Sequence, residues 1–179
     1  TFRWRYENIQ LTKKNGHMEI VELLISDSIL AVSHDFAEII DYAAGEGLME
    51  LVKILLAAVP ERYLKSAKFY DLPCRNGRGE VIKLLLSDKR VTLSHFLEPI
   101  FKNGCGEVLK LLLSHERVLS WDGEERDDFE DELFCAMRSA FKRGHVEVLK
   151  VIISDSRFSH LAFDHRYIRL AAERGHAEL

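Results

Sequence analysis

The chain has few prolines and few cysteines, and cysteines are the residues whose disulfides hold small secreted domains together. Its 179 residues include three prolines and three cysteines, and the cysteines, Cys74, Cys105 and Cys135, form no Cys-x-x-Cys pair. An odd number of cysteines without the pattern of a disulfide scaffold suits a reducing compartment. We therefore expect an intracellular, cytoplasmic protein, with the nucleus left open as a location.

Long apolar runs and an excess of one charge are also missing. No apolar run approaches the roughly 20 residues that span a bilayer, so no membrane partner is expected. The 25 Lys and Arg residues nearly balance the 29 Asp and Glu residues, which gives a net charge of −4. Generic binding to a phosphate backbone needs a concentrated basic face. A nucleic-acid partner is therefore not expected unless a local basic patch provides for it.

Motifs of catalysis and cofactor binding are absent from the sequence. It contains no Walker loop, no dinucleotide-binding glycine fingerprint and no Gly-x-Ser-x-Gly elbow. His160 and His165 lie near Asp164 but lack the His-x-x-x-His spacing of a zinc site on a helix. We expect no enzyme activity, no cofactor, no metal and no small-molecule substrate. The cysteines are interpreted as small packed hydrophobic residues.

What the sequence does contain is one recurring phrase. A polar residue and a glycine are followed by two variable residues, a glutamate and an apolar run, as in Asn15-Gly16-His17-Met18-Glu19-Ile20-Val21. Neighbouring glycines are 27 residues apart at the closest and 40 at the widest, a spacing typical of proteins built from stacked repeats. The six anchor glycines are Gly16, Gly47, Gly77, Gly104, Gly144 and Gly175.

Each copy predicts a pair of helices. The run after the glycine has apolar residues at positions 4, 5, 7, 8 and 9 from it, which fills most faces of a helix. An apolar residue seven positions before the glycine indicates a shorter helix there, and the glycine reverses the chain in the left-handed conformation. Because so wide an apolar surface must be covered on two sides, we expect neighbouring pairs to share burial.

Two local features follow from the same alignment of copies. Pro73 and Pro99 fall within the predicted first helices and should shorten or kink them. In copies two to five, a glutamate three residues after the glycine and a lysine six residues after it predict an ion pair on the helix surface. We interpret these pairs as a solvated outer face, and a binding ridge is the alternative.

The segment Tyr42-Ala43-Ala44-Gly45-Glu46-Gly47-Leu48-Met49-Glu50-Leu51-Val52-Lys53 resembles the helical half of an ankyrin repeat, as do residues 143–150 and 170–179. The family's Thr-Pro-Leu-His opening and its closing Gly-Ala-Asp are missing from every copy. The resemblance implies an all-α solenoid of stacked, divergent ankyrin-like helix-turn-helix repeats with short, irregular loops. It covers residues 1–179 as a single array, which we expect to be part of a longer one.

The widest spacing contains an acidic insertion directly after Trp121. Eight of the eleven residues 122–132 are Asp or Glu. Insertions in stacked repeats form loops that often bind partners, so we predict a loop here. Either it binds, or it is simply solvated and its last acids cap the following helix. The candidate binding residues are Trp121, Asp122, Glu124, Glu125, Asp127 and Asp128.

A second candidate surface comes from cations just before the anchor glycines. In ankyrin repeats these positions look out over the concave face, so the resemblance implies a basic stripe that faces an acidic ligand. Two other interpretations remain open: the cations stabilise the helix C-terminal dipole, or the acidic insertion folds onto them. The cations are Lys14, Arg75, Lys102, Lys142, Arg143 and Arg174.

The resemblance implies that the chain is a non-catalytic module that binds a protein partner on its concave face and loops. The partner's identity does not follow from the sequence. The alternative is the substrate-targeting arm of a larger enzyme or ubiquitin-ligase adaptor, whose catalytic or recruiting domain lies outside these residues. A third class, nucleic-acid binding through the basic stripe, would weaken steeply with salt.

Overall fold

The computed structural model describes residues 35–60, 64, 70–120, 123–163, 165–176 and 178. Every regular element in these ranges is a helix, and none of these residues belongs to a strand. The prediction of an all-α chain is confirmed at this level. The predictions made for Lys14, Gly16, Trp121 and Asp122 lie outside the described residues.

A helix precedes each described anchor glycine, and another helix follows Gly47, Gly77, Gly104 and Gly144. We call the helix before a glycine a first helix and the one after it a second helix. The first helices are α3 (Asp35–Glu46), α6 (Asp71–Arg75), α8 (Leu97–Asn103), α11 (Gly123–Arg143) and α13 (His165–Glu173). The second helices are α4 (Met49–Ala58), α7 (Gly79–Ser87), α9 (Gly106–Leu113) and α12 (Val146–Ser154). Shorter elements are α10 (Glu116–Leu119) and the 3₁₀ helices η2 (Leu93–Phe96) and η3 (Ser159–Phe163).

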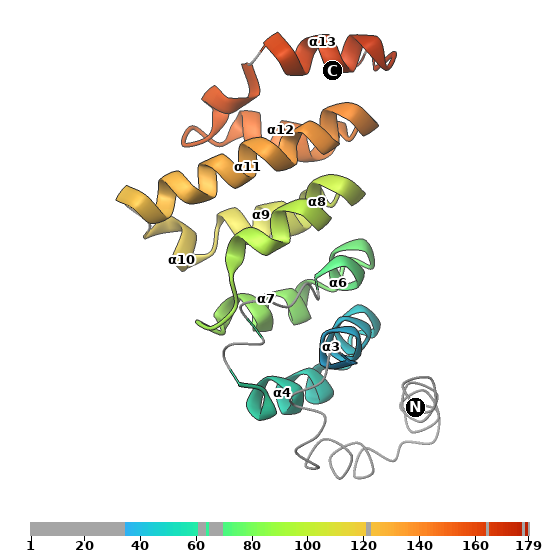
Figure 1. Ribbon diagram of the computed structural model, residues 1–179, viewed down its shortest axis with the longest axis vertical. Coiled ribbons are helices and arrows are strands. Elements are labelled where there is room, and N and C mark those ends of the chain that lie inside the picture. Colours follow the sequence, from blue (N-terminus) through green and yellow to red (C-terminus); the bar gives the residue numbers. More distant parts are fainter. Residues whose placement is uncertain are drawn as a thin grey trace.

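The helical pairs follow one another in chain order along the long axis of the molecule (Figure 1). First helices contact first helices, in the order α3, α6, α8, α11 and α13. Among the second helices, α9 packs between α7 and α12. Each pair is therefore covered mainly by the pair before it and the pair after it, so that apolar burial is shared between neighbours.

The second helices bury the faces that their sequence pattern predicts. In α7, Val81, Ile82, Leu85 and Leu86 are at most 3% exposed, and Leu84 on the flank is partly buried. The same four positions from the glycine are also buried in α4 and α9. The apolar pattern after the glycine therefore marks the core directly.

The first helices show how burial depends on a neighbour. The apolar residue seven positions before the glycine is at most 1% exposed in four copies: Ile40, Tyr70, Leu97 and Met137. The equivalent Ile168 of α13 is 59% exposed. In the described part of the chain no further helix covers the outer side of α13, and this accounts for the difference.

The five described anchor glycines adopt the left-handed backbone conformation that was predicted, with φ between 62° and 76°. Two of them also leave room for the next pair. A Cβ atom on Gly104 would lie 2.8 Å from Nδ1 of His145, and one on Gly144 would lie 2.6 Å from Nδ1 of His176. Glycine is needed there both for the turn and for the close approach of the imidazole ring.

Gly77 and Gly104 allow these two requirements to be separated. Nothing lies within 4 Å of a Cβ atom on Gly77, so Gly77→Ala should lower the free energy of unfolding by about 1 kcal/mol through backbone strain alone. Gly104→Ala should lower it by about 2 to 3 kcal/mol, because His145 must also move. Urea unfolding measures both values. Equal losses would contradict the steric role, and a double-mutant cycle with His145→Ala should show coupling.

Pro73 and Pro99 have the effect that was predicted for them. Their helices are short, five residues for α6 and seven for α8. Each proline is the third residue of its helix, where the backbone N–H would have no partner within the helix. The prolines therefore limit these helices without interrupting a hydrogen-bond ladder.

The predicted loop at residues 122–132 is wrong. Residues 123–132 form the first half of α11, the longest of the described helices at 21 residues. Carboxylates in the first turns stabilise a helix N-terminus, and Phe129 and Leu133 bury one face of this segment. Lys142 and Arg143 lie at the other end of the helix, about 30 Å from its start. The interpretation in which the insertion folds onto the cations therefore does not hold for these two residues.

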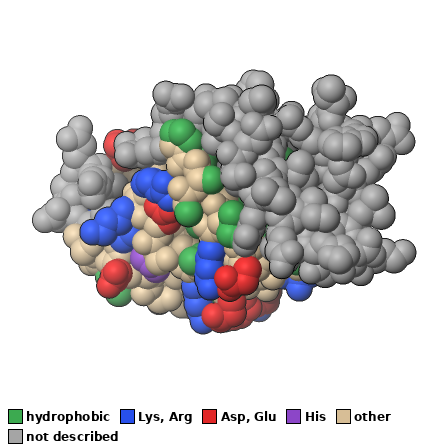
Figure 2. Space-filling view, turned by 90° about the horizontal axis from the view of Figure 1, so that it is seen from below, with side chains coloured by type: hydrophobic (Ala, Val, Ile, Leu, Met, Phe, Trp, Pro, Cys, Tyr) green, Lys and Arg blue, Asp and Glu red, His purple; other side chains and the backbone are tan. Residues whose placement is uncertain are grey.

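The predicted ion pairs of the second helices are confirmed. Lysine and glutamate are 2.6 to 2.9 Å apart in all four: Glu50 with Lys53, Glu80 with Lys83, Glu107 with Lys110, and Glu147 with Lys150. The pairs are exposed, and Figure 2 shows side chains of both signs next to one another on the face seen from below. Surface pairs of this kind contribute little to stability, because water and salt screen the charges.

Candidate functional site

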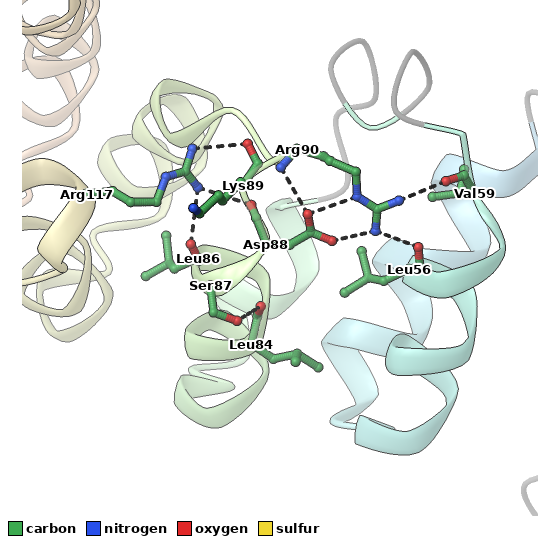
Figure 3. A network of polar contacts seen from close by, with 9 residues as sticks. All are labelled: Leu56, Val59, Leu84, Leu86, Ser87, Asp88, Lys89, Arg90 and Arg117. Carbon is green, nitrogen blue, oxygen red and sulfur yellow. Dashed lines mark hydrogen bonds and ion pairs between the residues drawn. The ribbon is translucent and has the colours of Figure 1, made fainter.

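Arginine side chains tie successive helical pairs together at the ends of the second helices. Arg90, Arg117 and Arg157 each stand 13 residues after an anchor glycine. Arg90 donates through Nη1 to the carbonyl oxygen of Val59 at 3.1 Å and through Nη2 to that of Leu56 at 2.7 Å (Figure 3). These carbonyls belong to the C-terminal end of α4, where a helix has unsatisfied acceptors and partial negative charge.

Arg117 makes the most extensive of these contacts. Its Nη1 donates to the carbonyl oxygens of Leu86 at 3.2 Å and Asp88 at 3.1 Å (Figure 3). Its Nη2 donates to the carbonyl oxygen of Val91 at 3.0 Å. The guanidinium thus covers the end of α7 and the loop that follows. A planar group with several fixed donors suits such a cluster of acceptors.

Arg157 repeats the arrangement at the end of α9, where its Nη2 donates to the carbonyl oxygen of Leu113 at 2.9 Å. In two copies an aspartate holds the arginine, Asp88 with Arg90 and Asp155 with Arg157, each at 2.6 Å. Hydrogen bonds from these arginines lower the pKa of both aspartates. Sequence reasoning missed these contacts, although the arginine recurs at a constant distance from the glycine.

At the other end of the pairs, the residue after the anchor glycine joins neighbouring first helices. His145 donates through Nε2 to the carbonyl oxygen of Lys102 at 3.0 Å, and His176 donates to that of Lys142 at 3.2 Å. Arg78 donates to the carbonyl oxygen of Gly45 at 2.9 Å. The recurrence of histidine at this position thus has a structural explanation. The described residues contain no group of three or more His, Cys, Asp or Glu side chains that could hold a metal ion.

Asp41 is a partly buried carboxylate at the joint between α3 and α6. Its Oδ1 accepts a hydrogen bond from the backbone N–H of Leu72 at 3.1 Å. Burial raises the pKa of Asp41 from 3.8 to about 6, although the Leu72 hydrogen bond opposes the shift, and the nearby Asp71 raises the pKa further. At neutral pH the ionised carboxylate of Asp41 therefore lowers the stability of the folded state.

The raised pKa of Asp41 predicts a pH-dependent stability. Because the folded state binds this proton more tightly than the unfolded state, the free energy of unfolding should fall as the pH rises from about 4 to about 6 and stay lower above that. Asp41→Asn should add about 1 kcal/mol at pH 7, a value reduced for partial solvation, and little at pH 4. Thermal unfolding at the two pH values measures this. An equal gain at both would contradict the assignment.

A groove of about 790 Å³ opens on the first-helix side, between α6, α8 and α11. Most of its surface is apolar, contributed by residues such as Pro99 and Ala136. Three successive helical pairs form it, so it depends on their stacking. Its charged lining residues are Asp71, Glu98, Lys102, Asp131 and Glu132.

The structure brings two of the predicted cations together and leaves the others apart. Arg75 and Lys102 both reach Asp71, at 2.6 and 3.9 Å, and Lys102 also lines the groove. In this part of the predicted basic stripe, the carboxylate of Asp71 therefore offsets the positive charges. The remaining described cations are exposed at or just after the ends of α11 and α13: Lys142, Arg143 and Arg174.

The acidic candidates lie along α11. Glu124 and Glu125 belong to its first turn, and Asp127 and Asp128 are exposed on the next turn. One of the two interpretations of the insertion treated its last acids as helix caps, and neither interpretation selected Asp131 or Glu132, which line the groove. The position of these two acids one turn after Asp127 and Asp128 was the available signal.

The three cysteines differ in exposure. Cys74 is buried, Cys105 is half-buried and Cys135 is exposed and lines the groove. The interpretation of a packed hydrophobic residue holds for Cys74 and is wrong for Cys135. Burial raises the pKa of the thiols of both Cys74 and Cys105. Cys135 therefore offers a chemical reporter of the groove.

Comparison of the chain with protein-family models, curated proteins and solved structures finds no match in any of the three. Among the helices of the described ranges, none combines the length and the apolar character that crossing a membrane requires. The functional interpretation of the groove rests on its geometry and its charge.

Proposed function

We propose that this chain is a divergent ankyrin-like solenoid that acts as a non-catalytic module for binding a protein partner. The stacking of helical pairs in chain order supports this proposal, as do the left-handed glycine at each pair and the side-chain contacts at both ends of the joints. Stacked repeats of this kind present extended surfaces to partners.

The observation that carries the proposal is the groove between α6, α8 and α11. It lies on the first-helix side, which an ankyrin-like array uses as its concave face. The lining of the groove combines apolar surface with charged side chains, an arrangement typical of a protein-binding surface. Lys102, one of the predicted binding residues, lies in it, and the exposed Asp127 and Asp128 lie next to it on α11.

A substitution that fills the groove tests this function. Ser139 lines the groove, so Ser139→Arg should block a partner, whereas Ser156→Arg places the same side chain outside it. We expect tagged wild-type chain and Ser156→Arg to capture the same partner from lysate, and Ser139→Arg to lose at least about 90% of it, a tenfold loss in affinity. Circular dichroism controls for folding. Undiminished capture by folded Ser139→Arg would exclude the groove as the binding site.

A further inference from the structure

The groove also indicates what kind of segment it receives. On the basis of the proposed function, we infer that it binds an extended segment of the partner that is rich in lysine and arginine, with apolar residues between the cations. This assignment differs in sign from the acidic ligand that the basic stripe predicted. The argument rests on the balance of charge around mostly apolar walls.

Carboxylates outnumber cations in the lining of the groove by four to one, if His95 is counted as neutral. Asp71 is already held by Arg75 and Lys102. Neither Asp131 nor Glu132 has an ion-pair partner among the described residues, and both are exposed. Two carboxylates in the lining of a mostly apolar groove are therefore available to a cationic side chain.

The rest of α11 strengthens this preference. Asp127 and Asp131 are four residues apart, as are Asp128 and Glu132, and all four side chains are exposed. Like charges at this spacing repel one another on a helix and destabilise it. A cationic segment that lies along the groove would relieve this repulsion while its apolar residues contact the partly exposed Pro99 and Ala136.

The shape of the surface favours an extended segment. The groove runs across α6, α8 and α11, because all three helices contribute residues to its lining. Crossing three helices that are about 10 Å apart requires roughly 20 Å, which about six to eight extended residues span.

A pair of synthetic peptides tests the inference. The first is a fluorescein-labelled peptide of about eight residues, two Arg-Leu-Lys-Ser units, and the second has Glu and Asp in place of Arg and Lys. We expect fluorescence anisotropy to show binding of the basic peptide alone, weakening as salt is raised. The double variant Asp131→Asn/Glu132→Gln should bind it about tenfold more weakly. The control Glu107→Gln/Glu147→Gln makes the same change in charge on the second helices and should bind like the wild type.

Alkylation locates the peptide. Bound basic peptide should slow the reaction of Cys135 with iodoacetamide at least about threefold and leave Cys105 unchanged, because only Cys135 lines the groove. Equal binding of the acidic peptide, wild-type affinity in the double variant, or no protection of Cys135 would each overturn the inference. If Ser139→Arg abolishes partner capture but the basic peptide does not bind, the inference fails and the proposed function stands.

Discussion

Leu112→Ala should lower the free energy of unfolding by about 3 to 4 kcal/mol. Leu112 lies in α9, which packs between α7 and α12, and its side chain is fully buried. The substitution removes buried methyl groups and leaves a cavity that fixed neighbours on both sides cannot fill. A matched control is Ile153→Ala in α12, where the side chain is 49% exposed and the loss should stay below about 1 kcal/mol.

The same substitution tests whether stability is shared between pairs. Since α7 and α12 each lose part of their packing partner, amide hydrogen exchange should accelerate in both helices as well as in α9. Urea unfolding gives the total loss in the free energy of unfolding, and amide exchange measured by NMR shows which helices are destabilised. Faster exchange confined to α9 would contradict the nearest-neighbour description of the molecule.

Arg117→Ala should lower the free energy of unfolding by about 2 to 3 kcal/mol. The guanidinium donates to the carbonyl oxygens of Leu86, Asp88 and Val91, which would lose a charged donor at the end of α7. Hydrogen bonds to charged groups contribute more than neutral ones, although partial solvation limits the sum. Urea unfolding of the variant measures the loss.

Two variants test whether the several N–H donors of the Arg117 guanidinium are responsible for this loss of stability. Arg117→Lys keeps the charge but cannot reach several carbonyls at fixed angles, so it should recover less than half of the loss. Arg138→Ala removes an exposed arginine of α11 and should change stability by less than about 0.5 kcal/mol. If Arg117→Lys were as stable as the wild type, charge near the helix end would suffice and the hydrogen-bond geometry would be irrelevant.

Several features of the fold were predictable because each depends on a short stretch of chain. The apolar positions after Gly77 marked the buried face of α7, and Pro73 and Pro99 marked the short helices α6 and α8. The same is true of the ion pairs between Glu and Lys, which need only the geometry of one helix turn.

The acidic insertion shows where local reasoning went wrong. It was predicted as a loop because it interrupts the repeat, yet Phe129, Leu133 and Met137 recur every four residues and are all buried in α11. That spacing is a helix signal within the insertion itself. The departure from the repeat length was given more weight than the periodicity, and the periodicity was the correct guide.

The candidate site was less predictable than the helices. The cations before the glycines were chosen from their place in the repeat, and only Lys102 among them lines the groove. Asp131 and Glu132 acquire their importance from α8, which faces them across the groove. The neighbouring residues in the sequence do not predict where Asp131 and Glu132 lie relative to another first helix.

The sequence by itself determined the helical pairs, their order, the left-handed turn at each described anchor glycine and the buried face of each second helix. These properties follow from hydrogen bonds and side-chain spacing within one pair of helices. Only the tertiary structure decided the arginine contacts, the histidine contacts, the groove and the exposure of Cys135. All of these features depend on how different helical pairs lie against one another. The hydrogen bonds of Arg117 and Arg157, for example, join residues that are 26 to 44 positions apart in the sequence.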